Sequence, residues 1–259
     1  MRFEVDALLF DMDGTLVDST ASVLRGWQTV AAEFPIPPDL FAVVPRHGRP
    51  AVEILADLLP AELIPAAAER LDELERTDTG DVVLLPGAAR LLAAAPAGRW
   101  AVVTSAGRQL ARVRLGAAGV DIGGVSAAGV GSAGLGTADP DAAGVGIVGV
   151  DGPVLVTIDD VSRGKPDPEP FLLGAKLLGV PPERCLVFED APAGLAAARA
   201  AGAATVAVAT THAADELDAD VVVPDLSAVR IAGVTAPEGG EDGERGESGA
   251  AGRIVVIVD

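Results

Sequence analysis

The chain has 259 residues, of which 49% are apolar, and its net charge is −19 at pH 7. Such a length can bury a sizeable core in one large domain, or in a core with a smaller second domain. The negative charge argues against binding to nucleic acids or anionic membranes, which need basic surfaces. No apolar run approaches the roughly 20 residues of a membrane span, so we expect no membrane partner.

The N-terminus and the cysteine content favour a cytoplasmic protein. Residues 1–6 carry acidic side chains where a secretory signal peptide carries basic ones, and no cleavage pattern follows. Cys185 is the single cysteine, which rules out an internal disulfide bond. We therefore expect a soluble, cytoplasmic monomer.

The first chemical pattern is an apolar run over residues 5–10 that ends at Asp11 and Asp13, followed by Gly14 and Thr15. On an extended chain, residues i and i+2 point to the same side, so the two carboxyl groups share one space. Gly14 permits a sharp exit from the strand. The alternative is an Asx-turn with both acids solvated. At the carboxyl end of a buried parallel strand, however, the pair would lie where open α/β sheets bind ligands.

Residues 17–82 have a helical pattern. Apolar residues at helical spacing predict a helix over 19–34, which the prolines of 35–38 end, and two further helices over 50–59 and 61–76. We interpret this block as a helical unit inserted into a chain of a different pattern.

The rest of the chain, 1–16 and 83–229, alternates between strands and helices, which predicts a parallel sheet with helices on both faces. The expected strands are 100–104, 154–158, 185–188, 205–209 and 221–223, and the expected helices are 87–95, 108–118, 169–178 and 192–201. Residues 121–152, rich in Gly, Ala and Val, form an insertion within this core. Residues 230–259 are expected to be a flexible acidic tail that ends in a strand-like run.

Three later segments follow the first pattern in order: Val102-Val103-Thr104-Ser105, Arg163-Gly164-Lys165-Pro166-Asp167-Pro168 and Val187-Phe188-Glu189-Asp190-Ala191. Together with residues 11–15, they resemble the four motifs of the haloacid dehalogenase-like hydrolase superfamily. The resemblance covers roughly residues 3–225 apart from 121–152, and is to small-molecule phosphatases with a helical cap after the first motif. It implies an α/β fold, with a doubly wound Rossmann-like parallel sheet as core and an inserted helical cap domain.

The resemblance also implies a chemistry for the acidic residues. Asp11 would attack phosphorus and form an aspartyl-phosphate, and Asp13 would act as acid and then as base. Mg²⁺ would be held by Asp11, the backbone carbonyl of Asp13 and Asp190, with Glu189 nearby or acting through water. Without the other motifs, Glu189 and Asp190 would indicate only an ordinary strand-to-helix turn with a helix N-cap.

The resemblance implies that different residues bind the phosphate and the alcohol part of the substrate. Lys165 would neutralise the phosphoryl oxygens. Thr104 and Ser105 compete for the role of hydroxyl donor, with Ser105 favoured, and Ala106 would offer its N–H. The turn Arg46-His47-Gly48-Arg49 resembles a specificity loop, in which His47, Gly48 and Arg49 would contact the substrate. The alternative is a basic surface turn.

The sequence therefore predicts a Mg²⁺-dependent phosphatase of small phosphorylated metabolites, with sugar or polyol phosphates favoured. A dehalogenase would not need Asp13, and a phosphonate hydrolase of this superfamily would need a cap lysine, which this chain lacks. A sugar phosphomutase of the same superfamily is the nearest rival, but this chain has Val23 where the mutases have a histidine. A catalytically silent binding module is the other rival, since the insertion at 121–152 could displace Lys165.

Overall fold

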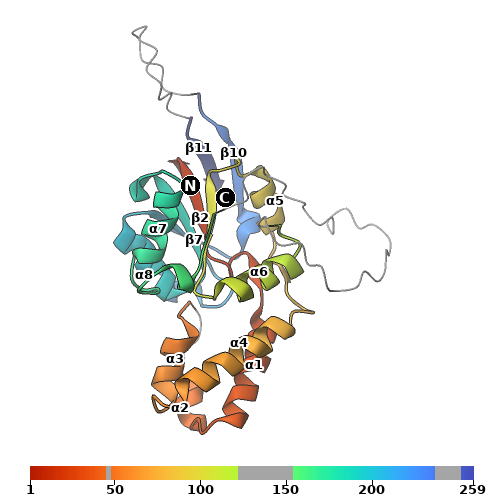
Figure 1. Cartoon of the computed structure of the whole chain (residues 1–259). Coiled ribbons are helices and arrows are strands. Elements are labelled where there is room, and N and C mark those ends of the chain that lie inside the picture. The colour runs from red at the N-terminus through yellow and green to blue at the C-terminus, as the bar shows by residue number, and fades with distance from the viewer. Residues whose placement is uncertain (45–47, 122–153, 237–251) are drawn as a thin grey trace, which may run out of the picture.

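A sheet of six parallel strands forms the centre of the computed structural model, which describes residues 1–44, 48–121, 154–236 and 252–259 (Figure 1). The spatial order of the strands is β6-β5-β2-β7-β8-β9. They are β2 (Ala7–Phe10), β5 (Trp100–Val103), β6 (Val154–Val156), β7 (Cys185–Glu189), β8 (Ala204–Val208) and β9 (Val221–Val223). The expected α/β class and parallel sheet are confirmed.

Helices cover both faces of this sheet, because its strands are apolar on both sides. Leu8 and Phe10 pack on one face, whereas Leu9 and its neighbours pack on the other, as the two-residue period of a strand requires. Helices α5 (Ala88–Ala94) and α6 (Arg108–Ala117) cover the first face, and α7 (Glu169–Leu177) and α8 (Pro192–Ala201) cover the second. Short 3₁₀ turns lie at Ile158–Asp160, Pro182–Arg184, Ala214–Glu216 and Leu226–Ala228.

A separate group of helices, which we call the cap (residues 17–84), enters and leaves the core through the antiparallel pair β3 (Val17–Asp18) and β4 (Val83–Leu84). It contains α1 (Thr20–Glu33), α2 (Pro38–Val43), α3 (Ala51–Leu58) and α4 (Ile64–Thr77). Trp27, Ile54 and Leu71 pack together in its own small core. The sequence did not predict α2, because Pro38 reads as a helix stop, yet a first helical turn tolerates proline.

The C-terminal run belongs to the fold. Strand β11 (Ile254–Val258) lies between β1 (Arg2–Val5) and β10 (Val229–Val234) in an antiparallel sheet that packs on the α5 and α6 side of the core. The strand-like run expected at the end of 230–259 is thus the paired strand β11, and residues up to Val234 continue β10. The acidic part of the expected tail, 237–251, lies outside the described residues. Pairing with both neighbours satisfies the edges that would otherwise expose this apolar run.

Two further expectations concern the insertion and the membrane. Apart from Asp121, the insertion expected at 121–152 lies outside the described residues. Among the described helices, none is both long and apolar enough to cross a membrane.

Replacing Ile254 with Ala should lower the free energy of unfolding by about 2–5 kcal/mol, because the Ile254 side chain is fully buried and its removal leaves a cavity. The matched control is Ile257→Ala on the opposite face of the same strand, where the side chain is only half-buried. Urea unfolding of both variants measures the difference. Equal losses would contradict the placement of β11 in the core.

Candidate active site

The acidic residues of the site lie at the carboxyl ends of the two central strands β2 and β7. Asp11 directly follows β2, and its backbone N–H donates to the carbonyl of Phe188 over 2.9 Å. Glu189 ends β7, and Asp190 follows it. One carboxylate oxygen from each of these three acids lies within 4.8 Å of the others. Parallel strand order thus brings the first and fourth motifs together.

Lys165 reaches this acidic group from the loop before α7. Its ammonium nitrogen is 2.6 Å from Asp11 Oδ1 and 2.7 Å from Glu189 Oε1, and it donates to the carbonyl of Val103 over 3.0 Å. The side chain is only 1% exposed. The insertion between the second and third motifs therefore does not displace Lys165 from the acids.

Burial controls the charge of this cluster. It raises the pKa of Asp11 to about 7; the Lys165 ammonium opposes this rise, and the neighbouring Glu189 adds to it. Burial, followed by the charges of Glu189 and Asp11, raises the pKa of Asp190 well above its usual range. Although burial lowers the pKa of Lys165, the charges of Asp11 and Glu189 raise it overall. Three buried carboxyl groups thus lie beside one ammonium group.

These properties fit a hard divalent cation. The three acids offer only oxygen ligands, which Mg²⁺ and Ca²⁺ prefer, and the cluster has more potential negative charge than Lys165 can balance. Glu189 already accepts bonds from Lys165 and from the N–H of Ala191, and Asp190 accepts bonds from the hydroxyl groups of Thr15 and Thr211. Within the described part of the chain, Asp11, Glu189 and Asp190 are the acids grouped closely enough to hold a metal ion.

Two glycines make room for the acids. Gly14 adopts the left-handed conformation, with φ of 84°, and a Cβ there would overlap the carboxyl group of Asp190. A Cβ on Gly194, in the first turn of α8, would overlap the carboxyl group of Glu189. Only glycine allows the turn at Gly14 and both close approaches without strain.

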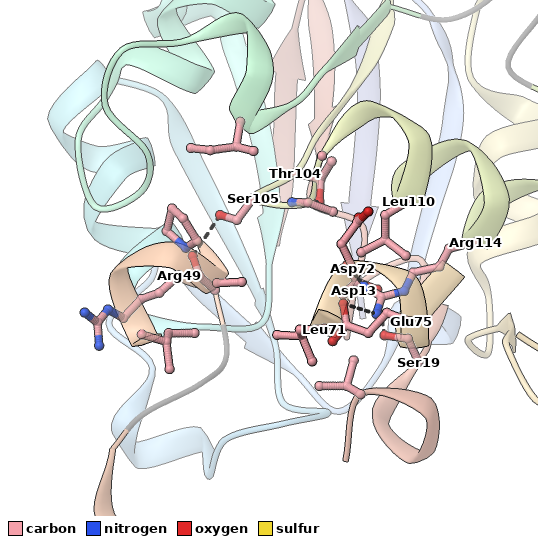
Figure 2. Close-up of a pocket in the computed structure, with 18 of the residues that line it drawn as sticks. Asp13, Ser19, Arg49, Leu71, Asp72, Glu75, Thr104, Ser105, Leu110 and Arg114 are labelled. Atoms are coloured by element: carbon pink, nitrogen blue, oxygen red, sulfur yellow. Dashed lines mark hydrogen bonds and ion pairs between the residues drawn. The ribbon is translucent and has the colours of Figure 1, made fainter. Parts of the chain in front are cut away.

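Asp13 lies on the cap side of Asp11 and has partners that the sequence did not reveal. Ser19 Oγ donates to Asp13 Oδ1 over 2.6 Å, and Arg114 Nη1 is 3.0 Å from Asp13 Oδ2 (Figure 2). Arg114 belongs to α6, and its Nη2 is 3.1 Å from Oε2 of Glu75 on α4 of the cap. In the sequence, Arg114 falls among the apolar positions Leu110 and Leu115 of an amphipathic helix, which does not show what Arg114 contacts.

The second motif lies beside the acids. Thr104 directly follows β5, is almost fully buried, and its Oγ1 accepts a hydrogen bond from Ala106 N–H over 3.0 Å. Ser105 Oγ donates instead to the carbonyl of Gly48 in the cap over 3.0 Å (Figure 2). The three residues line the same cavity, and their two hydroxyl groups have different partners.

A cavity with a volume of about 320 Å³ lies between the cap and the core. Its walls include Asp11, Asp13 and the second motif from the core, and Trp27 and Leu71 from the cap. A cavity at this edge of the sheet can hold a small molecule against Asp11.

The expected specificity loop is only partly described. His47 lies outside the described residues, whereas Gly48 and Arg49 line the cavity. The Arg49 guanidinium pairs with Asp57 at 2.9 Å, and Figure 2 shows it pointing away from Asp13. In this structure the guanidinium of Arg49 is therefore directed to Asp57 and not into the cavity that the residue lines.

The loop after β8 supports the fourth motif. Thr211 donates its hydroxyl to Asp190, and His212 Nδ1 lies 3.1 Å from the Asp190 carbonyl oxygen. His212 is half-buried beside Asp190.

The fold and the site together combine a parallel α/β core, a helical cap and a cluster of buried acids beneath it. The profile of the haloacid dehalogenase-like hydrolase family matches residues 5–202, more than half of the chain. The chain belongs to this family, which confirms the resemblance seen in the four motifs.

Individual relatives agree with this assignment. The chain is 36% identical to hexitol phosphatase A of Escherichia coli (strain K12), over 81% of this chain and 87% of that protein. It is 35% identical to validoxylamine A 7'-phosphate phosphatase of Streptomyces hygroscopicus subsp. limoneus, over 86% and 94% respectively. The crystal structure of a hydrolase from Pseudomonas syringae superimposes with a TM-score of 0.68 at 27% identity, over 85% of this chain and 94% of that one.

Replacing Gly194 with Ala should lower the free energy of unfolding by about 1–3 kcal/mol, because the added methyl group must displace the buried Glu189 carboxyl group. The same change at Gly116 of α6, where a Cβ would meet no atom within 4 Å, should instead stabilise by about 0.5–1 kcal/mol. Thermal and urea unfolding compare the two variants. A stabilising Gly194→Ala would contradict the packing of Glu189 against α8.

Proposed function

We propose that the chain is a Mg²⁺-dependent phosphatase that hydrolyses phosphate monoesters of small metabolites, with sugar or polyol phosphates as the favoured class. The observation that carries this proposal is the buried contact of Lys165 with both Asp11 and Glu189. It puts a fixed positive charge beside a carboxylate that faces a cavity of substrate size. Similarity to a hexitol phosphatase over most of the chain supports the substrate class.

The reaction would begin with attack of the Asp11 carboxylate on phosphorus. The new bond from Asp11 to phosphorus forms as the bond from phosphorus to the alcohol oxygen breaks, which gives an aspartyl-phosphate. The departing oxygen needs a proton, and Asp13 would supply it as a carboxylic acid. Asp13 lines the same cavity as Asp11, two residues further along the chain.

The second half of the reaction would return both acids to their starting state. Asp13, now ionised, would take a proton from a water molecule, whose oxygen attacks the phosphorus of the aspartyl-phosphate. Inorganic phosphate leaves, Asp11 recovers its carboxylate, and Asp13 again carries a proton. The cap would keep other water away from the site during transfer.

Asp11, the backbone carbonyl of Asp13 and Asp190 would hold Mg²⁺, with Glu189 nearby or acting through water. The ion would supply positive charge that lets an anionic nucleophile approach an anionic phosphate. Thr211 orients Asp190 through its hydroxyl group. Lys165 would add the second positive charge at the same point.

The phosphoryl oxygens would be bound by Lys165 and by the second motif, Thr104, Ser105 and Ala106. We favour Thr104 as the hydroxyl donor, because Ser105 donates its proton to the carbonyl of Gly48. Ser105 would then contribute its backbone N–H close to the start of α6. Ala106 would do the same once its N–H, which donates to Thr104 Oγ1 in this structure, turns to the phosphoryl group.

The alcohol part of the substrate would occupy the cavity below the cap. Val23 of α1 lines this cavity at the place where the mutases resembled by this chain would have a histidine. This favours hydrolysis over transfer within a sugar. The intact contacts of Lys165 equally argue against a silent binding module. A monomeric state and a cytoplasmic location stay predictions.

Phosphate release from a panel of sugar, polyol and nucleotide monophosphates, with Mg²⁺ and with chelator, tests this function. We expect metal-dependent release from the sugar or polyol members, and at least about a 10³-fold lower rate in Asp11→Asn, because the amide is a poor nucleophile. The Asp11→Asn variant should fold normally, as unfolding curves would show.

Activity of Asp11→Asn close to that of the wild type would contradict the role of Asp11 as nucleophile. Turnover that requires a sugar bisphosphate activator would instead identify a mutase.

Arg49→Ala should raise KM for the sugar or polyol phosphate by about 5–50-fold, if the guanidinium leaves Asp57 and contacts the alcohol when substrate binds. KM for an aryl phosphate, which has no remote hydroxyl groups, should change little. Asp57→Ala is the matched control, because it removes the same ion pair and keeps the guanidinium. Equal effects of Arg49→Ala on the KM values of both substrates would show that Arg49 does not recognise the alcohol part of the substrate.

A further inference from the structure

Arg114 connects the cap to Asp13 through two ion pairs. Its guanidinium lies between the two carboxyl groups, 3.0 Å from Asp13 Oδ2 and 3.1 Å from Glu75 Oε2, and its side chain is 3% exposed (Figure 2). Ser19 Oγ binds the other oxygen of Asp13. Both oxygens of Asp13 thus have a fixed partner, whereas the side chain is 28% exposed and lines the cavity.

A buried guanidinium at this point needs an explanation beyond packing. Burying a charge is unfavourable unless it is paired, and an apolar side chain of similar volume often stabilises at least as well. At the neighbouring buried positions of α6, Leu110 and Leu115 fill the space without a charge that needs a partner. The charge of Arg114 is therefore better explained by what it does to Asp13 than by stability.

The same ion pairs join two parts of the molecule. Arg114 and Asp13 belong to the core, and Glu75 belongs to α4 of the cap, which packs against α6 (Figure 1). Burial, opposed by Arg114, raises the pKa of Glu75 to about 7. The position of α4 therefore affects the guanidinium that contacts Asp13.

We propose that Arg114 is a positioning residue for Asp13, and that Glu75 of the cap holds Arg114 in the orientation that does this. The inference rests on the proposed function, in which Asp13 protonates the departing alcohol oxygen. A general acid acts only within hydrogen-bond distance of the atom that it protonates, so an orienting partner raises the fraction of productive geometries. Ser19 and Arg114 fix the carboxyl group from two sides.

The dependence of the rate on the leaving group separates this role from a purely structural one. A nitrophenolate leaves without a proton, whereas a sugar or polyol alkoxide needs one, so only the second substrate requires a well-placed Asp13. The measured quantity is kcat/KM, because it reports the steps up to the first phosphoryl transfer and not the later hydrolysis shared by both substrates.

Arg114→Met and Glu75→Gln should lower kcat/KM for the polyol phosphate by about 10–100-fold, and for nitrophenyl phosphate by less than about 3-fold. Asp13→Asn should show the same selectivity with a larger loss. Combining Asp13→Asn with Arg114→Met should add little, because both changes act on one group. Arg114→Lys keeps the charge but has one nitrogen for two carboxyl groups, and should give an intermediate loss.

The matched control is Arg76→Met. Arg76 lies on α4 one residue from Glu75, and its Nη1 donates to Gln109 Oε1 of α6 over 3.3 Å. It therefore contacts the same two helices without touching Asp13, and the ratio of the two kcat/KM values should stay at the wild-type value.

The possible outcomes separate the inference from the proposed function. Selective loss in Asp13→Asn without selective loss in Glu75→Gln and Arg114→Lys would overturn the inference and leave the function intact. Equal losses on both substrates in Asp13→Asn would overturn the acid role of Asp13 itself. If Arg114→Met does not fold, Glu75→Gln and Arg114→Lys decide, with activity on nitrophenyl phosphate as evidence of a folded site.

Discussion

The charges of the acidic site depend on the contact of one buried ammonium group with two buried carboxyl groups. Lys165 lies against Asp11 and Glu189 with almost no exposure to solvent, and Asp190 adds a third acid beside them. Burying such charges is unfavourable unless they are paired and hydrogen-bonded. Because one lysine cannot balance three acids, burial raises the pKa of Asp11 to about 7 and that of Asp190 well above its usual range. A divalent cation would complete the charge balance.

The topology of the sheet makes this contact possible. Asp11 and Lys165 are 154 residues apart in sequence. They meet because the carboxyl ends of all parallel strands lie at the same edge of the sheet. The cap then covers that edge, since the chain leaves and returns through β3 and β4 directly beside Asp13. Ion pairs through Arg114 extend the acidic site into α4 of the cap. The acidic residues of the site and the cap are thus joined by ion pairs.

The short motifs of the site could be predicted from the sequence because their information is local. Asp11, Lys165 and Asp190 each lie in a short segment whose pattern and order identified both the fold and the family. Arg114 could not be found in this way, because α6 has other arginines and their burial depends on how α6 meets the cap. The pairing of β11 with β1 joins the two ends of the chain, a contact that no local pattern encodes.

Binding of Mg²⁺, measured by calorimetry on the chelator-treated protein, tests the central claim most directly. The account predicts binding by the wild type, and an affinity at least about 10-fold lower in Asp190→Asn, which removes one oxygen ligand. The exposed Glu183→Gln removes the same charge far from the cluster and should bind as the wild type does. Absence of binding by the wild type, or equal binding by all three proteins, would contradict a metal site at these acids.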